Sequence, residues 1–238
     1  MAISKRKLLV DGQGRRLLNG VEAEKVVDTV PLSMFTALGD ALRKSDLNES
    51  AHYIPDALEV VRALNIKPGD KAFVLSPSIS LWAERMMLAQ GARVDMVEGS
   101  SLRFEMKKSW LEDEFKDFNV DGLDKLRRLI KNRARISQGN FLYLPLDPDS
   151  YDIVLMSCVL DSDSGMEPVL LKGLDILKTG GRLSLGFYTP SPLTFDNEKV
   201  LDVSGQNGIK LEEIPTSRFF GDEVVSGGLF RLRGKPNT

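Results

Sequence analysis

The sequence is poor in the side chains that most metal sites and many catalytic sites use. It contains one cysteine, Cys158, and one histidine, His52, in 238 residues. A single cysteine excludes an internal disulfide, and a lone thiol fits a reducing compartment, so we expect a cytoplasmic protein. One cysteine with one histidine argues against a structural zinc site. A Ser-His-Asp triad would have to use His52, and no G-x-S-x-G sequence accompanies it. We therefore expect neither a metal site nor a hydrolase of this kind.

Long apolar runs and a strong net charge are also missing. No stretch approaches 18 consecutive apolar residues, so we expect no transmembrane helix and no membrane partner. The formal net charge of −2 argues against a chain that binds polyanions over its whole surface. The sequence does contain 42% hydrophobic and 28% charged residues, which is enough apolar material for one sizeable core with a small appendage.

The N-terminal part is predicted to be a hairpin followed by helices. A hairpin is expected at residues 7–18, because an Asp-Gly turn signal lies between two apolar runs. A helical stretch follows at about 21–44, where Ser33 is a candidate cap after a proline. A clearer helix at 55–64 begins with a proline at its first position. We divide the chain into a hairpin-and-helix extension, residues 1–54, and a main domain, residues 55–238.

Short apolar strands alternate with helices in the main domain. Strands are predicted at 71–75, 93–97, 141–144, 152–156 and 182–187, and helices at 78–90, 101–116, 121–136, 166–178 and about 195–205. Two final strands, at about 209–215 and 228–234, have no helix between them and should form an antiparallel hairpin at a sheet edge. This alternation predicts an α/β fold with a doubly wound, mostly parallel seven-stranded sheet that helices cover on both faces.

Four segments of this domain resemble the class I S-adenosylmethionine-dependent methyltransferases. They are a Pro-Gly turn with the strand that follows it, a second strand that ends in an acid, a third segment with a Leu-Pro turn, and a Thr-Gly-Gly turn into a later strand (64–75, 91–100, 139–155 and 177–186). The resemblance implies a Rossmann-like methyltransferase fold, S-adenosylmethionine as cofactor, and catalysis largely by positioning of an acceptor that the sequence does not identify. The connection at about 105–136 is longer than is usual in this family, and we interpret it as a helical insertion over one end of the sheet.

The loop that should hold the cofactor departs from the family pattern. The family has an acid and then glycines after its first strand, whereas Ser76, Pro77, Ser78 and Ile79 stand here, and no glycine occurs between residues 70 and 90. Pro77 fixes φ and lacks an N–H donor, and Ile79 adds a branched side chain where the family has bare backbone. The serines nevertheless keep the loop small and polar, and the next helix offers N–H groups. Ser76 and Ser78 are therefore candidate cofactor contacts.

The resemblance also assigns residues at the ends of later strands. Glu98 would accept both hydroxyl hydrogens of a ribose, or it is a solvated loop acid, and Gly99 would leave room for the sugar. Asn140 stands where the family often has an aspartate at the adenine amino group, and Phe141 would border the adenine or belong to the core. Asp161, after the fourth strand, could orient a nucleophile or act as a base, or it could simply cap a turn.

The predicted helix at 121–136 has an apolar stripe of Leu123, Leu126 and Ile130. Its cations, which would project from the other side, are Lys125, Arg127, Arg128 and Lys131. They form either a solvated helix face or a site for an anionic ligand, RNA or an acidic partner.

Two functions remain open from the sequence. The first is a methyltransferase, which Glu98 and Asn140 favour. The second is a non-catalytic pseudo-methyltransferase, a pseudoenzyme that serves as a scaffold or regulatory subunit, which the glycine-free loop favours.

Overall fold

The structure is a computed structural model that describes most of the chain in ten stretches. These are residues 8–10, 16–18, 21–22, 29–45, 51–77, 81–113, 118–157, 166–186, 197–214 and 227–236. The candidate site residues Ser78 and Asp161 lie outside the described residues. Within these stretches, no helix has both the length and the apolar character needed to cross a bilayer.

The N-terminal stretches contain a small antiparallel sheet of three strands: β1 (Leu8–Val10), β2 (Arg16–Leu18) and β3 (Val21–Glu22). The pairing of β1 with β2 confirms the predicted hairpin. The helix expected from residue 21 is wrong at its start, because Val21 and Glu22 pair with β2 as a third strand. The second half of that prediction is α1 (Ser33–Leu42). Ser33 is its first helical residue rather than its cap: Leu32 occupies the cap position and makes no side-chain capping hydrogen bond.

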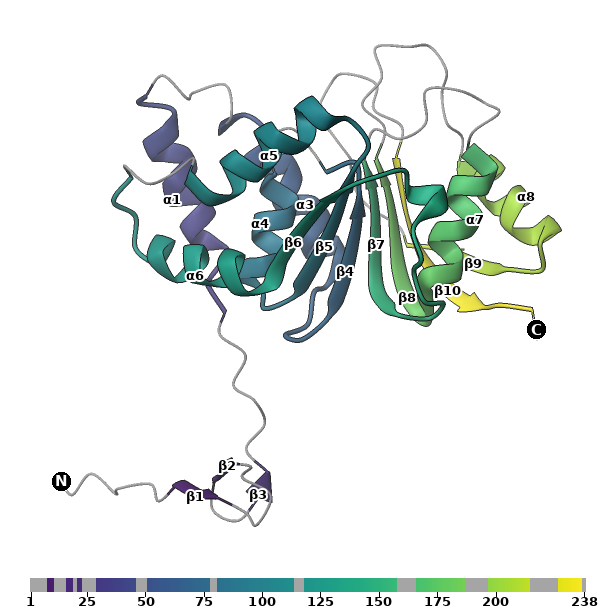
Figure 1. Ribbon diagram of the computed structural model, residues 1–238, viewed down its shortest axis with the longest axis horizontal. Coiled ribbons are helices and arrows are strands. Elements are labelled where there is room, and N and C mark those ends of the chain that lie inside the picture. Colours follow the sequence, from purple (N-terminus) through teal and green to yellow (C-terminus); the bar gives the residue numbers. More distant parts are fainter. Residues whose placement is uncertain are drawn as a thin grey trace.

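The main sheet has seven strands in the order β6-β5-β4-β7-β8-β10-β9 (Figure 1). The first five in this order run parallel, and β10 pairs antiparallel with both β8 and β9. This confirms the α/β fold and the antiparallel hairpin at one edge. The strands are β4 (Lys71–Leu75), β5 (Arg93–Glu98), β6 (Ala134–Gln138), β7 (Tyr151–Ser157), β8 (Leu177–Gly186), β9 (Lys210–Glu213) and β10 (Gly227–Gly234).

Helices cover both faces of this sheet and form two hydrophobic clusters with it. The helices are α3 (Ile54–Leu64), α4 (Trp82–Ala89), α5 (Ser101–Asp113), α6 (Leu123–Arg133), α7 (Met166–Ile176) and α8 (Asn197–Gln206), with a 3₁₀ turn η1 (Phe141–Tyr143). One cluster joins α1, α3, α4 and α6 to the face that Val74 and Val94 contribute. The other joins η1, α7 and α8 to the opposite face, which includes Phe73 and Val154. The alternation of side chains along the buried strands sends successive residues to these two clusters.

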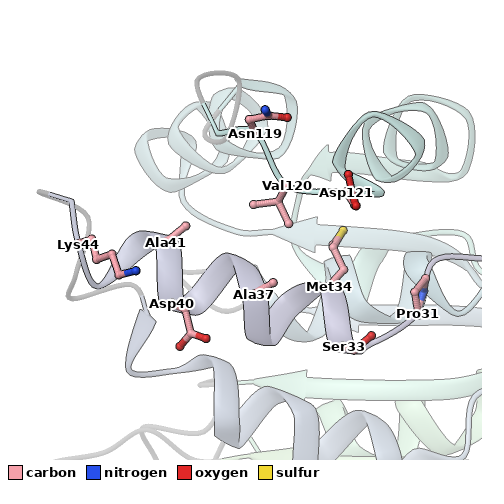
Figure 2. A pocket seen from close by; sticks show the side chains of 10 residues that line it. All are labelled: Pro31, Ser33, Met34, Ala37, Asp40, Ala41, Lys44, Asn119, Val120 and Asp121. Atoms are coloured by element: carbon pink, nitrogen blue, oxygen red, sulfur yellow. The ribbon is translucent and has the colours of Figure 1, made fainter.

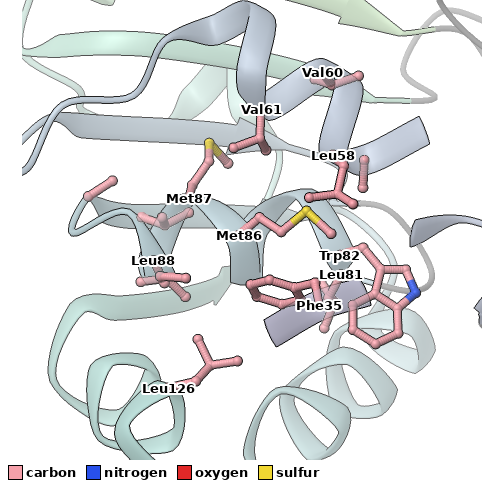
Figure 3. Packing of buried hydrophobic residues seen from close by; sticks show 14 of the residues in the cluster. Phe35, Leu58, Val60, Val61, Leu81, Trp82, Met86, Met87, Leu88 and Leu126 are labelled. Atoms are coloured by element: carbon pink, nitrogen blue, oxygen red, sulfur yellow. The ribbon is translucent and has the colours of Figure 1, made fainter. Parts of the chain in front are cut away.

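The larger cluster centres on α4, which is buried along almost its whole length (Figure 3). Met86 lies between Leu58 of α3 and Leu126 of α6, with Trp82 to one side, and all four side chains are at most 7% exposed. α1 joins the outside of this layer, where the ring of Phe35 packs edge-on against Trp82 with centroids 6.2 Å apart. α1 therefore packs on the same core as the main domain.

The third strand of the sheet differs from the prediction. It is β6, at Ala134–Gln138, and the residues expected as a strand at 141–144 instead form the turn η1. α6 accordingly ends at Arg133 and not at residue 136. β6 is an edge strand with one exposed face, so only its residues Ala134 and Ile136 face the core. Its other residues are polar, and in the sequence they look like a continuation of the polar face of α6. Similarly, α7 ends at Ile176, two residues before its predicted end, and β8 begins at once with an irregular register near its start.

Candidate functional site

The edge of the sheet where β4 and β5 end is the natural place for a ligand. The strand order reverses between β4 and β7, and open α/β sheets bind ligands in the crevice outside the carboxyl ends of the strands at such a reversal. Ser76 and Pro77 follow β4 at this edge, and Glu98 is the last residue of β5. The edge therefore brings together Ser76 and Glu98, two of the residues that the sequence proposed for the cofactor.

The loop after β4 keeps a backbone path that glycine prefers, although it contains no glycine. Ser76 has a φ of +52° and Leu81 a φ of +54°, both in the left-handed region. The Ser76 N–H donates a hydrogen bond to the Val97 carbonyl at 2.9 Å, which fixes the first turn of the loop against β5. The missing glycines therefore do not mean that the glycine-like turns are missing. The sequence alone did not indicate this, because neither serine nor leucine is typical at a positive φ.

Glu98 lies inside the protein and does not project into solvent. It is 3% exposed, and its two carboxylate oxygens have separate partners. Oε1 accepts the Ser100 N–H at 3.0 Å, and Oε2 accepts a hydrogen bond from the Nζ ammonium of Lys107, which comes from the second turn of α5. The same Nζ donates to the carbonyl oxygen of Pro77 in the loop after β4. Lys107 thus joins the loop after β4, β5 and α5 through one buried ammonium group.

The charge of Glu98 follows from these contacts. Burial by itself raises the pKa of the carboxyl group, because it penalises the charged form. The hydrogen bonds from Lys107 and the Ser100 N–H, with the nearby charges of Lys107 and Arg103, outweigh this and lower the pKa below its ordinary value. Glu98 is therefore a carboxylate at neutral pH, and Lys107 forms a buried ion pair with it. A ribose that used this carboxylate would have to displace an ammonium group that already occupies it.

The other cofactor candidates at this edge have local structural partners. Gly99 is exposed, and a Cβ added to it would meet only the Gly139 carbonyl oxygen, 4.0 Å away, so there is open space beside it. The Oδ1 atom of Asn140 accepts the Leu142 N–H at 3.0 Å and caps η1. Phe141 is 4% exposed and packs against Phe73 with ring centroids 5.3 Å apart. Little of its ring is left on the surface for an adenine to contact.

The basic residues of α6 do not form one continuous exposed group. The apolar stripe is confirmed, since Leu123, Leu126 and Ile130 are buried. On the other side, Arg127 forms an ion pair with Asp124 at 2.6 Å, and both Lys125 and Arg127 are half-buried. Arg128 and Lys131 are the exposed pair among the four candidate cations.

Lys107 is the residue of this site that sequence reasoning missed. It lies nine residues after Glu98, in a segment that was correctly predicted to be helical. The spacing alone could not identify it, because α5 lacks an apolar stripe that would fix its orientation. Leu102 and Met106 are 72% and 41% exposed, whereas the charged Lys107 is buried.

A hollow lies away from this edge, between α1 and the segment that leads into α6 (Figure 2). It has a volume of about 610 Å³, and neither Glu98 nor Lys107 lines it. Its lining residues are Pro31, Ser33, Met34, Ala37, Asp40, Ala41, Lys44, Asn119, Val120 and Asp121. Asp40 is held by an ion pair with Arg43 at 2.6 Å, so the hollow does not gather free charges of one sign.

Comparison with solved structures identifies the architecture. A SAM-dependent methyltransferase from Aquifex aeolicus is similar over 87% of this chain and 100% of its own, with a TM-score of 0.53 and 12% identity. A SAM-dependent methyltransferase from Methanosarcina mazei is similar over 74% of this chain and 97% of its own, with a TM-score of 0.51 and 10% identity. A predicted O-methyltransferase from Agrobacterium tumefaciens is similar over 76% of this chain and 82% of its own, with a TM-score of 0.50 and 17% identity.

The chain has the Rossmann-like methyltransferase fold. No protein-family model matches the sequence, and no curated protein matches it either. At identities of 10–17% the structural likeness establishes the fold alone. The activity has to be argued from the residues at the carboxyl edge.

Proposed function

We propose that this protein is a non-catalytic member of the methyltransferase fold, a pseudo-methyltransferase that acts as a scaffold or regulatory subunit. The observation that supports this most strongly is the buried pair of Glu98 and Lys107. The carboxylate that the resemblance assigns to the ribose already accepts two hydrogen bonds from within the chain. A cofactor would have to replace these two hydrogen bonds, and its binding gains free energy only if its own hydrogen bonds to Glu98 are stronger than the ones it breaks.

The charge of the cofactor makes this exchange less favourable. S-adenosylmethionine carries a sulfonium, an ammonium and one carboxylate, a net charge of +1, and Lys107 places a further positive charge at the loop carbonyl of Pro77. Like charges repel more strongly where water is excluded, so this ammonium group disfavours a cationic ligand at the carboxyl edge. We therefore infer that wild-type protein binds the cofactor with a dissociation constant well above the micromolar range.

A methyltransferase activity remains the second candidate because of the loop geometry. Ser76 and Leu81 adopt the left-handed backbone conformation that glycines supply in cofactor-binding loops. The space beside Gly99 is also open. For this function Lys107 would have to leave Glu98 when the cofactor binds.

Equilibrium dialysis with radiolabelled S-adenosylmethionine separates the two candidates. An active methyltransferase of the same fold, run in parallel, shows that the label is competent to bind. We expect no saturable retention of the label by this protein at micromolar cofactor, and no transfer of label to the protein or to a cell extract. Saturable micromolar binding, with transfer of label to an acceptor, would establish the enzyme instead.

A further inference from the structure

Resting on the proposed function, we propose that Lys107 is a built-in occupant of a ribonucleoside position, an autoinhibitory contact that also holds the amino-terminal half of α5 against the sheet edge. Removal of its ammonium group unmasks Glu98 for the vicinal diol of a ribonucleoside. In this proposal the Lys107 side chain blocks the ribonucleoside site, while the residues that would form the site are retained.

One hydrogen bond of Lys107 uses an acceptor that a ribose on Glu98 would also need. An ammonium group has three donors and no acceptor. One donor points to Oε2 of Glu98 and another to the carbonyl oxygen of Pro77. A vicinal diol also donates two hydrogen bonds, and a carboxylate accepts them well because charge-assisted bonds are strong. Lysine and sugar therefore compete for the Oε2 atom of Glu98, while Oε1 accepts the Ser100 N–H.

The amino-terminal half of α5 has few other attachments. All of residues 101–109 are described, and only Phe104 and Lys107 among them are not exposed. The carboxyl-terminal half is better fixed, since Leu111 is buried and the Trp110 carbonyl accepts a hydrogen bond from Arg85 at 2.7 Å. Segments with few buried apolar contacts open at low free energy. Lys107 is thus the main internal contact of a half-helix that lies beside the open space at Gly99.

The neighbouring residue provides a matched control. Lys108 is exposed, so Lys108→Met removes the same charge from the same helix turn without touching Glu98. Lys107→Met keeps the apolar stem that fills the buried space and deletes the ammonium group. Lys107→Gln is a second neutral variant for the case in which the methionine variant does not fold.

The test is titration calorimetry of wild type and variants with adenosine, 2′-deoxyadenosine and S-adenosylhomocysteine, after circular dichroism has shown that each variant is folded. We expect no binding at micromolar ligand for wild type and Lys108→Met. We expect Lys107→Met to bind adenosine at least about tenfold more tightly than 2′-deoxyadenosine, which lacks one of the two hydroxyl groups. The double variant Lys107→Met with Glu98→Gln should lose this preference.

Hydrogen exchange gives an independent measurement of the same device. Amide protons of residues 101–109 should exchange faster in Lys107→Met than in Lys108→Met. If neither folded neutral variant binds adenosine, the autoinhibitory contact is refuted, and the pseudo-methyltransferase proposal stands. If wild type itself binds adenosine or S-adenosylhomocysteine at micromolar concentration, both proposals are refuted.

Discussion

The buried pair of Lys107 and Glu98 makes a quantitative prediction about stability. Glu98 is 3% exposed in the wild-type protein, and Lys107→Met leaves its carboxylate with only the Ser100 N–H as a hydrogen-bond donor. Removal of one member of a buried ion pair typically costs about 3–5 kcal/mol, because the remaining charge is uncompensated. We expect a loss near the lower end of this range, about 3 kcal/mol, since the Ser100 N–H and the nearby charge of Arg103 still favour the carboxylate.

The double variant isolates the interaction between the two side chains. Glu98→Gln alone leaves the Lys107 ammonium with the Pro77 carbonyl and a neutral amide oxygen, and should cost about 2 kcal/mol. With both changes no buried charge remains, so the loss should be smaller than the sum of the single losses by at least about 1.5 kcal/mol. The free energy of unfolding of each variant is measured by urea unfolding at neutral pH, which is followed by the fluorescence of the two tryptophans and analysed with a common m-value.

The control for this cycle is Lys108→Met, which should change the free energy of unfolding by no more than about 0.5 kcal/mol because its side chain is exposed. Losses from the two single changes that add to within about 0.5 kcal/mol would refute a direct interaction between Lys107 and Glu98. A Lys107→Met variant as stable as Lys108→Met would refute it as well.

Three further predictions concern other parts of the molecule and other conditions. The pKa of Glu98 is lowered in the folded state, so the ionised carboxylate stabilises the fold above the ordinary pKa of 4.5, and this stabilisation is lost as the pH falls through the lowered pKa. The difference in unfolding free energy between wild type and Glu98→Gln should therefore shrink below pH 4.5 in acid unfolding curves. Phe141→Ala should cost about 3–5 kcal/mol in urea unfolding, because the ring is buried against Phe73, and a loss under about 1 kcal/mol would contradict a core role. The anionic-ligand prediction for α6 requires that charge reversal at Arg128 and Lys131 weaken the binding of a labelled single-stranded RNA and reduce its salt slope by about 2 in fluorescence anisotropy; unchanged binding leaves a solvated helix face.

Much of the fold could be predicted because buried strands carry a strong signal. β4 and β7 are short, continuous apolar runs, and their places in the chain agree with the prediction to within one residue at each end. β6 could not be recognised in the same way, because an edge strand buries only one face and its arginine and serine residues extend the pattern of the preceding helix. Phe141 and its apolar neighbours looked like a strand, but they form a 3₁₀ turn capped by Asn140 in which Phe141 is buried and Leu142 and Tyr143 are exposed.

The candidate site shows a similar division. The position of Glu98 at the end of a strand followed from local pattern, since an acid directly after an apolar run marks the carboxyl edge. Its buried state did not follow, because it depends on how α5 folds back over that edge. The contacts of Lys107 join three segments, and none of them is encoded by spacing within one helix or strand. The positive φ of Ser76 was equally hidden, since it arises from tertiary contacts at a residue that does not usually adopt it.

A crystal structure of the wild-type protein grown with millimolar S-adenosylhomocysteine would show directly which group occupies Glu98. We expect the Nζ atom of Lys107 to lie on the Glu98 carboxylate and the Pro77 carbonyl, with no nucleoside at the carboxyl edge of β4 and β5. Electron density for a ribose on Glu98, with Lys107 displaced and the amino-terminal half of α5 moved away, would contradict this expectation.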